Sequence, residues 1–362
     1  MKRLSLLAIL SLLCVTLACA QATRMLTGDK SNEYGLIYSL PLTELNIDLT
    51  ANFTERVAGP YRQYAPRYLG KVDVIENDSR SCELQSAAIY TRGTAGPDKY
   101  LMTIKPGATT SICVDADGML LAINTEASQS PIPALPADVT PQRPDMDEYL
   151  KYVDEDFLVS LSDAKKAQML ARAIMEIRES RLSLSRGTAE TMPTDGRQLE
   201  LMLQSLQAQE DAMMRAFTGY EYSYTESRRI TVVPDSTDLP ETSFVVARLA
   251  PGDHFRNSDD LVGEPIILSI TGISTPELPL NAKGEPKAMP KEAVVYRLPG
   301  TANITLQFRG RNFLNSEVEL AQNGILFGLD PKLFTDKRAP SCAIFNPATG
   351  AVEKIATLGT NP

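Results

Sequence analysis

A chain of 362 residues is longer than a typical single domain and can bury more than one hydrophobic core. Its 36 Lys and Arg against 45 Asp and Glu give a net charge of −9, which argues against nucleic acid as a partner because phosphate binding needs clustered cations. The single His excludes multi-histidine metal sites, and no CxxC, phosphate-loop or dinucleotide motif is present, so the sequence implies no cofactor and no metal.

The first residues have the pattern of an export signal. Lys2 and Arg3 make a basic start, and the apolar run over 4–17 is too short to span a bilayer. Small residues then predict cleavage between Ala20 and Gln21, which makes residues 1–20 a signal peptide. This pattern predicts an exported protein of the periplasm or the outer membrane.

Cys19 leaves a second mode of export open, because a cysteine after Ala18 also resembles the lipid-modification box of bacterial lipoproteins. Soluble export is favoured, since Thr16 stands where that box usually has an aliphatic residue. Removing Lys2 and Arg3 leaves 34 of the 36 basic residues against 45 acidic ones, a net charge of −11. No later apolar run reaches the roughly 20 residues of a membrane span, so the mature chain is predicted to have none.

Residues 21–130 read as an N-terminal β-rich domain. Apolar side chains fall on alternate positions, as a half-buried strand requires, at Leu36, Tyr38, Leu40, Leu45, Ile47 and Leu49. Cys82 and Cys113 could form a disulfide in this domain, or they could be small buried apolar residues; the sequence favours neither.

Three tyrosines within this domain suggest a recognition surface. Tyr61, Tyr64 and Tyr68 lie at helical spacing between Pro60 and Gly70. They could stack on a glycan or another small ligand. The favoured interpretation is an amphipathic turn that seals the first β domain, because tyrosine often buries its ring and leaves its hydroxyl in contact with solvent.

Residues 131–156 are predicted to be a linker. The segment 131–144 contains five prolines, which favour a stiff, extended connection. An acidic stretch follows, comprising Asp145, Asp147, Glu148, Asp154, Glu155 and Asp156. It lacks the spacing of an EF-hand calcium loop, so a solvated charged face is the preferred interpretation.

Residues 157–219 carry the clearest helical signal. One apolar stripe contains Ala167, Leu170, Ala171, Ile174 and Ile177, and a second contains Leu199, Met202, Leu203, Leu206, Met213 and Phe217 before Gly219. Two helices of similar length favour an antiparallel hairpin. Such stripes usually face a core, and the alternative is an arm that projects and binds a protein partner.

Residues 220–362 return to short β runs separated by Gly and Pro and are predicted to form a C-terminal β-rich domain. The expected fold is therefore α+β, with two β-rich domains, each a sandwich or a partly open barrel, bridged by a long antiparallel helical hairpin.

Catalytic residues are not evident in the sequence. His254 is the only histidine, no GxSxG elbow accompanies it, and a surface loop is its expected place. A pair of carboxylates could hydrolyse glycans or peptides, but 45 acidic residues always offer pairs, so this test has little specificity.

Several segments, taken in order, resemble an exported family of Bacteroides-type bacteria that is catalogued as domain of unknown function 4831. They include the segments 33–41, 59–70, 117–121, 263–265, 296–299 and 322–324. The resemblance implies an envelope protein without known activity and supplies no catalytic residue. In that bacterial group Asp235-Ser236-Thr237 would also resemble an O-glycosylation signal, with Ser236 as the acceptor.

The sequence as a whole favours a non-enzymatic envelope protein that serves as a structural or interaction module, with an envelope protein bound through the hairpin. The alternatives are a carboxylate-dependent glycan- or peptide-processing enzyme, and a glycan or small-ligand binder that uses the three tyrosines.

Overall fold

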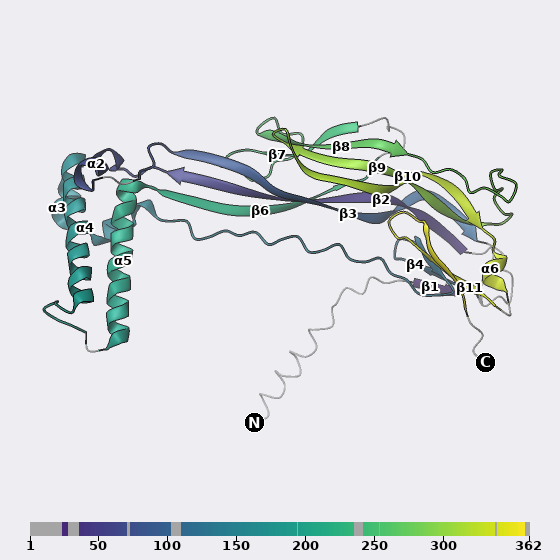
Figure 1. The fold of residues 1–362 in the computed structure, drawn as a ribbon, viewed down its shortest axis with the longest axis horizontal. Coiled ribbons are helices and arrows are strands. Elements are labelled where there is room, and N and C mark those ends of the chain that lie inside the picture. Colours follow the sequence, from purple (N-terminus) through teal and green to yellow (C-terminus); the bar gives the residue numbers. More distant parts are fainter. Residues whose placement is uncertain are drawn as a thin grey trace, which may run out of the picture.

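The computed structural model of the chain describes residues 24–27, 36–70, 73–102, 110–193, 195–234, 242–252, 254–336 and 339–358. These residues form an elongated molecule with helices at one end and three antiparallel β-sheets toward the other (Figure 1). The predicted signal peptide, Cys19, the cleavage site Ala20–Gln21 and Ser236 lie outside the described residues.

The strands belong to three sheets. The first has the order β3 (Ser79–Met102), β2 (Leu36–Val57), β6 (Tyr220–Val232). The second has the order β10 (Arg311–Leu329), β9 (Val294–Phe308), β8 (Glu264–Ser274), β7 (Thr242–Leu249). The third has the order β1 (Arg24–Thr27), β4 (Ser111–Val114), β5 (Leu120–Ile123), β11 (Ser341–Phe345), β12 (Val352–Thr357).

The helices lie mostly between β5 and β6 in the sequence. They are η2 (Arg62–Tyr64), α2 (Ala65–Tyr68), η3 (Met146–Tyr152), α3 (Glu155–Val159), α4 (Asp163–Arg186), α5 (Gly196–Thr218) and α6 (Lys332–Thr335). All except α6 gather at one end of the molecule in Figure 1, and we call that end the helical head.

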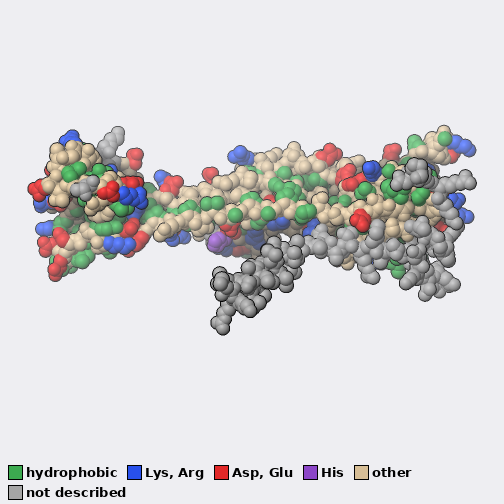
Figure 2. All heavy atoms as spheres, turned by 90° about the horizontal axis from the view of Figure 1, so that it is seen from below, with side chains coloured by type: hydrophobic (Ala, Val, Ile, Leu, Met, Phe, Trp, Pro, Cys, Tyr) green, Lys and Arg blue, Asp and Glu red, His purple; other side chains and the backbone are tan. Residues whose placement is uncertain are grey.

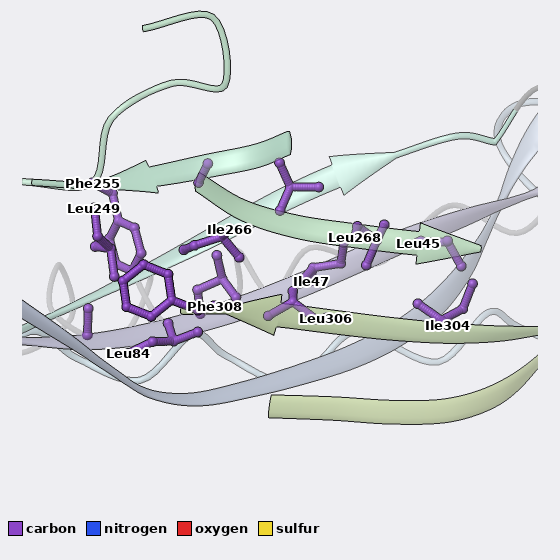
Figure 3. Packing of buried hydrophobic residues seen from close by; sticks show 14 of the residues in the cluster. Leu45, Ile47, Leu84, Leu249, Phe255, Ile266, Leu268, Ile304, Leu306 and Phe308 are labelled. Atoms are coloured by element: carbon purple, nitrogen blue, oxygen red, sulfur yellow. The ribbon is translucent and has the colours of Figure 1, made fainter. Parts of the chain in front are cut away.

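The largest core lies between the first two sheets, which pack as a sandwich. Every second residue of β2 turns inward, and Leu45, Ile47 and Leu49 are fully buried there, as their alternation predicts. Figure 3 shows Leu45 and Ile47 against inward side chains of the four-stranded sheet, among them Ile266, Leu268, Ile304, Leu306 and Phe308. Two half-buried sheets thus cover each other's apolar faces.

The same long strands continue into a second core. Tyr38 and Leu40 at the start of β2 and Val294 at the start of β9 are buried with residues of β4, β5 and β11. Because β2 and β9 each contribute to both cores, the two cores are joined by continuous backbone.

The expectation of two β-rich domains bridged by a helical hairpin needs correction. β2 pairs with β6 from Leu45–Val232 to Val57–Tyr220, and β5 pairs with β11. Strands before and after the helices therefore share sheets, and the hairpin is an appendage at one end. Periodicity identifies a strand and its buried face, but it does not identify the pairing partner.

The proline-rich segment 131–144, which we call the strap, runs extended along the outer edge of β6. Val139 exchanges two backbone hydrogen bonds with Thr225, at 3.1 and 2.9 Å, and the Ser227 N–H donates to Asp138 at 2.7 Å. The Tyr222 hydroxyl donates to the carbonyl of Pro141 at 3.0 Å. An exposed edge invites pairing with other chains, and the strap covers this one.

The outer face of β2 is polar and is also held by the strap region. Asp48 is buried and accepts two hydrogen bonds from the Arg229 guanidinium, both at 2.6 Å, while Arg229 also donates to the carbonyl of Pro133 at 2.7 Å. This planar pairing fixes β2, β6 and the strap relative to one another.

The predicted alternative of a disulfide between Cys82 and Cys113 is wrong in this structure. Both thiols are free and buried, Cys82 in the sandwich core and Cys113 in a small cluster with Leu121 and Ala122. Because the two cysteines lie on different sheets, the interpretation as small apolar core residues holds.

The contact between the strands that precede the helices and those that follow them can be tested at Gly93 of β3. A Cβ there would lie 1.9 Å from the carbonyl oxygen of Pro347, which comes from the loop between β11 and β12. We expect Gly93→Ala to lower the free energy of unfolding by about 1–3 kcal/mol through overpacking, as measured by urea denaturation. Gly196→Ala is the matched control, because nothing lies within 4 Å of its added Cβ and Ala favours a helix. Equal stabilities of the two variants would contradict this contact between the N- and C-terminal regions.

Candidate interaction surface on the helical head

Two helices, α4 and α5, form the antiparallel hairpin predicted from the sequence. α4 begins after the N-cap Ser162, whose hydroxyl accepts from the Lys165 N–H, and ends at Gly187 with a left-handed φ of 72°. α5 ends at Gly219, where φ is 77°. The chain enters the head twice, first from β2 and later from the strap, and leaves it through β3 and then β6, so the head stands at the end of a β-ribbon (Figure 1).

Packing in the hairpin changes along its length. Near the ribbon, the predicted stripe residues Leu170 and Ile174 of α4 and Met213 and Phe217 of α5 are buried. Toward the tip of the hairpin the predicted stripe of α5 is only partly covered, and Met202 is 38% exposed. Two helices share one seam, and in the described residues no third layer covers the distal half.

The three tyrosines predicted as a recognition surface instead hold the head together. The Tyr61 ring is 5% exposed and lies 6.0 to 6.3 Å from the rings of Tyr149, Phe157 and Phe217. The partly buried Tyr64 and Tyr68 pack against this cluster, and the Tyr68 hydroxyl donates to the carbonyl of Ala164 at 3.4 Å. Tyr61 is covered by helices, so its ring offers no stacking face to a ligand.

Much of the acidic stretch serves the helices of the head. Asp145 accepts from the Asp147 N–H at 3.0 Å, Asp154 accepts from the Phe157 N–H at 2.9 Å, and Glu148 forms an ion pair with Arg215. Carboxylates at helix starts satisfy free N–H groups and the helix dipole. Among the described residues no group of three or more potential ligands could hold a metal ion.

A buried carboxylate locks the two long helices together. Glu210 of α5 is 7% exposed, and it accepts from Arg178 Nε at 2.6 Å and from Arg181 Nη1 at 2.5 Å. Both arginines come from α4. A buried ion pair of this kind specifies the register of two helices more than it adds stability, because desolvation offsets much of the attraction. The sequence analysis did not identify Glu210. Its position within the apolar stripe of α5 could have indicated that its side chain is buried.

The outer surface of the head exposes aliphatic side chains. The end of α3 and the connection to α4 expose Leu158, Val159 and Leu161, of which Leu161 is fully exposed. On α4, Met175 and Leu182 are 44% and 48% exposed and lie seven residues apart, which places them on one face. We call these five residues the aliphatic surface of the head. The adjacent apolar run 158–161 in the sequence could have indicated it.

Charged groups border this surface. A cavity of about 630 Å³ between α3 and α4 is lined by Asp156, Lys165 and Arg172, among others. Figure 2 shows hydrophobic, basic and acidic side chains mixed over the head. Aliphatic side chains interspersed with charged groups are compatible with a protein interface.

Other sequence candidates lie apart from the head. His254 pairs with Glu226 at 2.8 Å and its side chain is 77% exposed, in agreement with a surface loop. In the part of the chain that the structure describes, the carboxyls with a shifted pKa are those of Glu210 and Asp260, and in each case hydrogen bonds keep the pKa below its ordinary value. Neither has the raised pKa of a general acid.

The comparison with known families gives a match over most of the chain. A family model described as "Domain of unknown function (DUF4831)" matches residues 34–353. The chain belongs to this family. The predicted family is thereby confirmed, whereas export and the bacterial group stay predictions. No curated protein and no solved structure gives a significant match. Within the described residues no helix has both the length and the apolar character needed to cross a membrane.

The lock at Glu210 can be tested by substitution. We expect Glu210→Gln to lower the free energy of unfolding by about 1–2 kcal/mol at pH 7, less than for a fully buried pair because both arginines are partly exposed. Glu200→Gln on the same helix is the control, since Glu200 is exposed and its partners, Arg197 and Gln204, lie on α5 itself. The free energies of unfolding would be measured by urea denaturation, with the helical circular dichroism signal as the readout. Equal decreases in both variants would contradict a lock at Glu210.

The pH dependence of stability provides a second test. Burial disfavours the charged Glu210 carboxylate, but hydrogen bonds from Arg178 and Arg181 outweigh this and lower its pKa. A lowered pKa contributes stability above the unfolded-state value of about 4.3, and this stability is lost as the pH falls through the folded-state value. We expect the difference in Tm between the wild type and Glu210→Gln to shrink as the pH falls from 7 to 3. A constant difference would show that the carboxylate's charge is not involved.

Proposed function

We propose that this protein is a non-enzymatic, exported envelope protein whose helical head binds a protein partner. The observation that carries the proposal is the placement of a partly covered helical hairpin, with an aliphatic surface, at the end of a long β-ribbon. Exposed aliphatic side chains on a distal, otherwise charged end favour a docking site over a structural one.

The position of the head supports a presenting role. β1, the first described segment, lies in the five-stranded sheet at the opposite end from the head (Figure 1). β2 alone has 22 residues and extends roughly 70 Å at about 3.3 Å per residue. A chain held near its N-terminus, by Cys19 in the lipid-anchored alternative, would carry the head away from the membrane.

The alternative functions have less support. A carboxylate-dependent enzyme needs a general acid, which is a carboxyl with a raised pKa. The pKa values of Glu210 and Asp260 are instead lowered, so neither carboxyl suits that role. A glycan site at the tyrosines would need open ring faces, and Tyr61 lies beneath helices of the head.

Site-specific photo-crosslinking in the native host tests the proposal. A photoreactive residue would replace Leu161 or Leu182 in the head, with Leu261 and Leu280 in the β part as exposed controls. We expect one envelope protein to be crosslinked at both head positions and at neither control, identified by mass spectrometry. Crosslinking only at the controls, or at no position, would contradict a docking head.

A surface substitution provides an independent readout of the same interaction. We expect Leu182→Asp to reduce the yield of the crosslink formed at position 161 at least tenfold, because a charge is placed in an apolar interface. The Tm should change by less than about 2 °C, since Leu182 is half exposed. An unchanged crosslink yield would show that this face of α4 is not part of the interface.

A further inference from the structure

A small cavity lies away from the head, where the turn between β9 and β10 meets β3. Its volume is about 250 Å³, and it is lined by Glu83, Leu84, Phe308, Arg309, Arg311 and Phe313. Leu84 and Phe308 are buried and form an apolar floor. The volume lies just below the roughly 300–1,000 Å³ of sites for drug-sized ligands, so the cavity suits a smaller molecule.

Arg309 is held in place at this cavity in an unusual conformation. Its φ is 51° and that of Gly310 is 73°, which is a type I′ hairpin turn with arginine where Asn, Asp or Gly is preferred. Its guanidinium forms two hydrogen bonds with Glu264, at 2.5 and 3.1 Å, and donates to the carbonyl of Cys82 at 3.1 Å. It also lies 4.9 Å from the centre of the Phe308 ring. Arg309 is therefore neutralised and rigid.

Two charged side chains at the cavity, Arg311 and Glu83, are exposed to solvent. The Arg311 guanidinium lies over the Phe313 ring at 5.1 Å, and neither it nor the Glu83 carboxylate has a hydrogen bond or ion pair within the described residues. Stacking on an aromatic ring holds a guanidinium flat and leaves its N–H donors free for a carboxylate.

We propose that this cavity binds a small zwitterion with an apolar side chain, of the class of a free hydrophobic amino acid. The ligand carboxylate pairs with Arg311, its ammonium pairs with Glu83, and its side chain covers Leu84 and Phe308. One cation and one anion beside an apolar floor match the charges and shape of such a molecule, and a ligand with a single charge would pair with only one of them.

Saturation-transfer NMR on the full chain tests this binding with three ligands. L-phenylalanine carries both charges, phenylacetate carries only the carboxylate, and 2-phenylethylamine carries only the ammonium. We expect saturable binding of L-phenylalanine in the millimolar range and at least tenfold weaker binding of the other two. Arg311→Gln should weaken L-phenylalanine about tenfold and leave 2-phenylethylamine unchanged, while Glu83→Gln should weaken L-phenylalanine and leave phenylacetate unchanged.

Lys332→Gln is the matched control, because it removes one exposed positive charge elsewhere. Both cavity substitutions are at exposed positions, and an unchanged Tm will confirm that each variant is folded. Three results would overturn the proposal: no saturable binding of L-phenylalanine, phenylacetate binding as tightly as L-phenylalanine, or an equal loss of binding in Lys332→Gln.

Discussion

The continuity of β2 is the constraint on which the rest of the molecule depends. This one strand packs into the core formed with β4, β5 and β11, then into the sandwich core, and finally forms the centre of the ribbon that carries the head. Its neighbours β3 and β6 pair with it on both sides, so the residues from Leu45 to Arg56 lie in the middle of a sheet. A central strand of this length transmits rigidity from one end of the molecule to the other.

A ribbon of three strands is a weak structure unless its faces and edges are covered. Here one face of β2 is apolar and closes against the four-stranded sheet, while the other is polar and holds the buried pair Asp48–Arg229. The strap covers the edge of β6 with backbone hydrogen bonds. Prolines suit this role because an extended segment with few N–H donors pairs on one side and ends the sheet. The strap thereby joins the five-stranded sheet to the head without adding a further edge.

The sequence predicted local structure well and long-range pairing poorly. The alternation at Leu45, Ile47 and Leu49 and the stripe through Ile174 predicted buried faces that the structure confirms, because both signals depend on neighbouring residues only. The pairing of β2 with β6 joins residues more than 160 positions apart, and no local pattern encodes it. For the same reason the tyrosines near position 61 were assigned to the first β domain, whereas they pack against helices that follow about 90 residues later. Glu210 was missed because a charged side chain is seldom buried unless it is paired, and its two arginine partners lie on the other helix.

The separation of the head from the sheets is the central structural claim, and small-angle X-ray scattering of the purified chain tests it most directly. A compact protein of this length would have a radius of gyration of about 21 Å. The ribbon predicts a value well above that, with a scattering profile of an elongated particle whose largest dimension exceeds the roughly 70 Å length of β2. A radius of gyration near 21 Å would mean that the head folds back onto the sheets, and the interpretation of a presented docking end would be wrong.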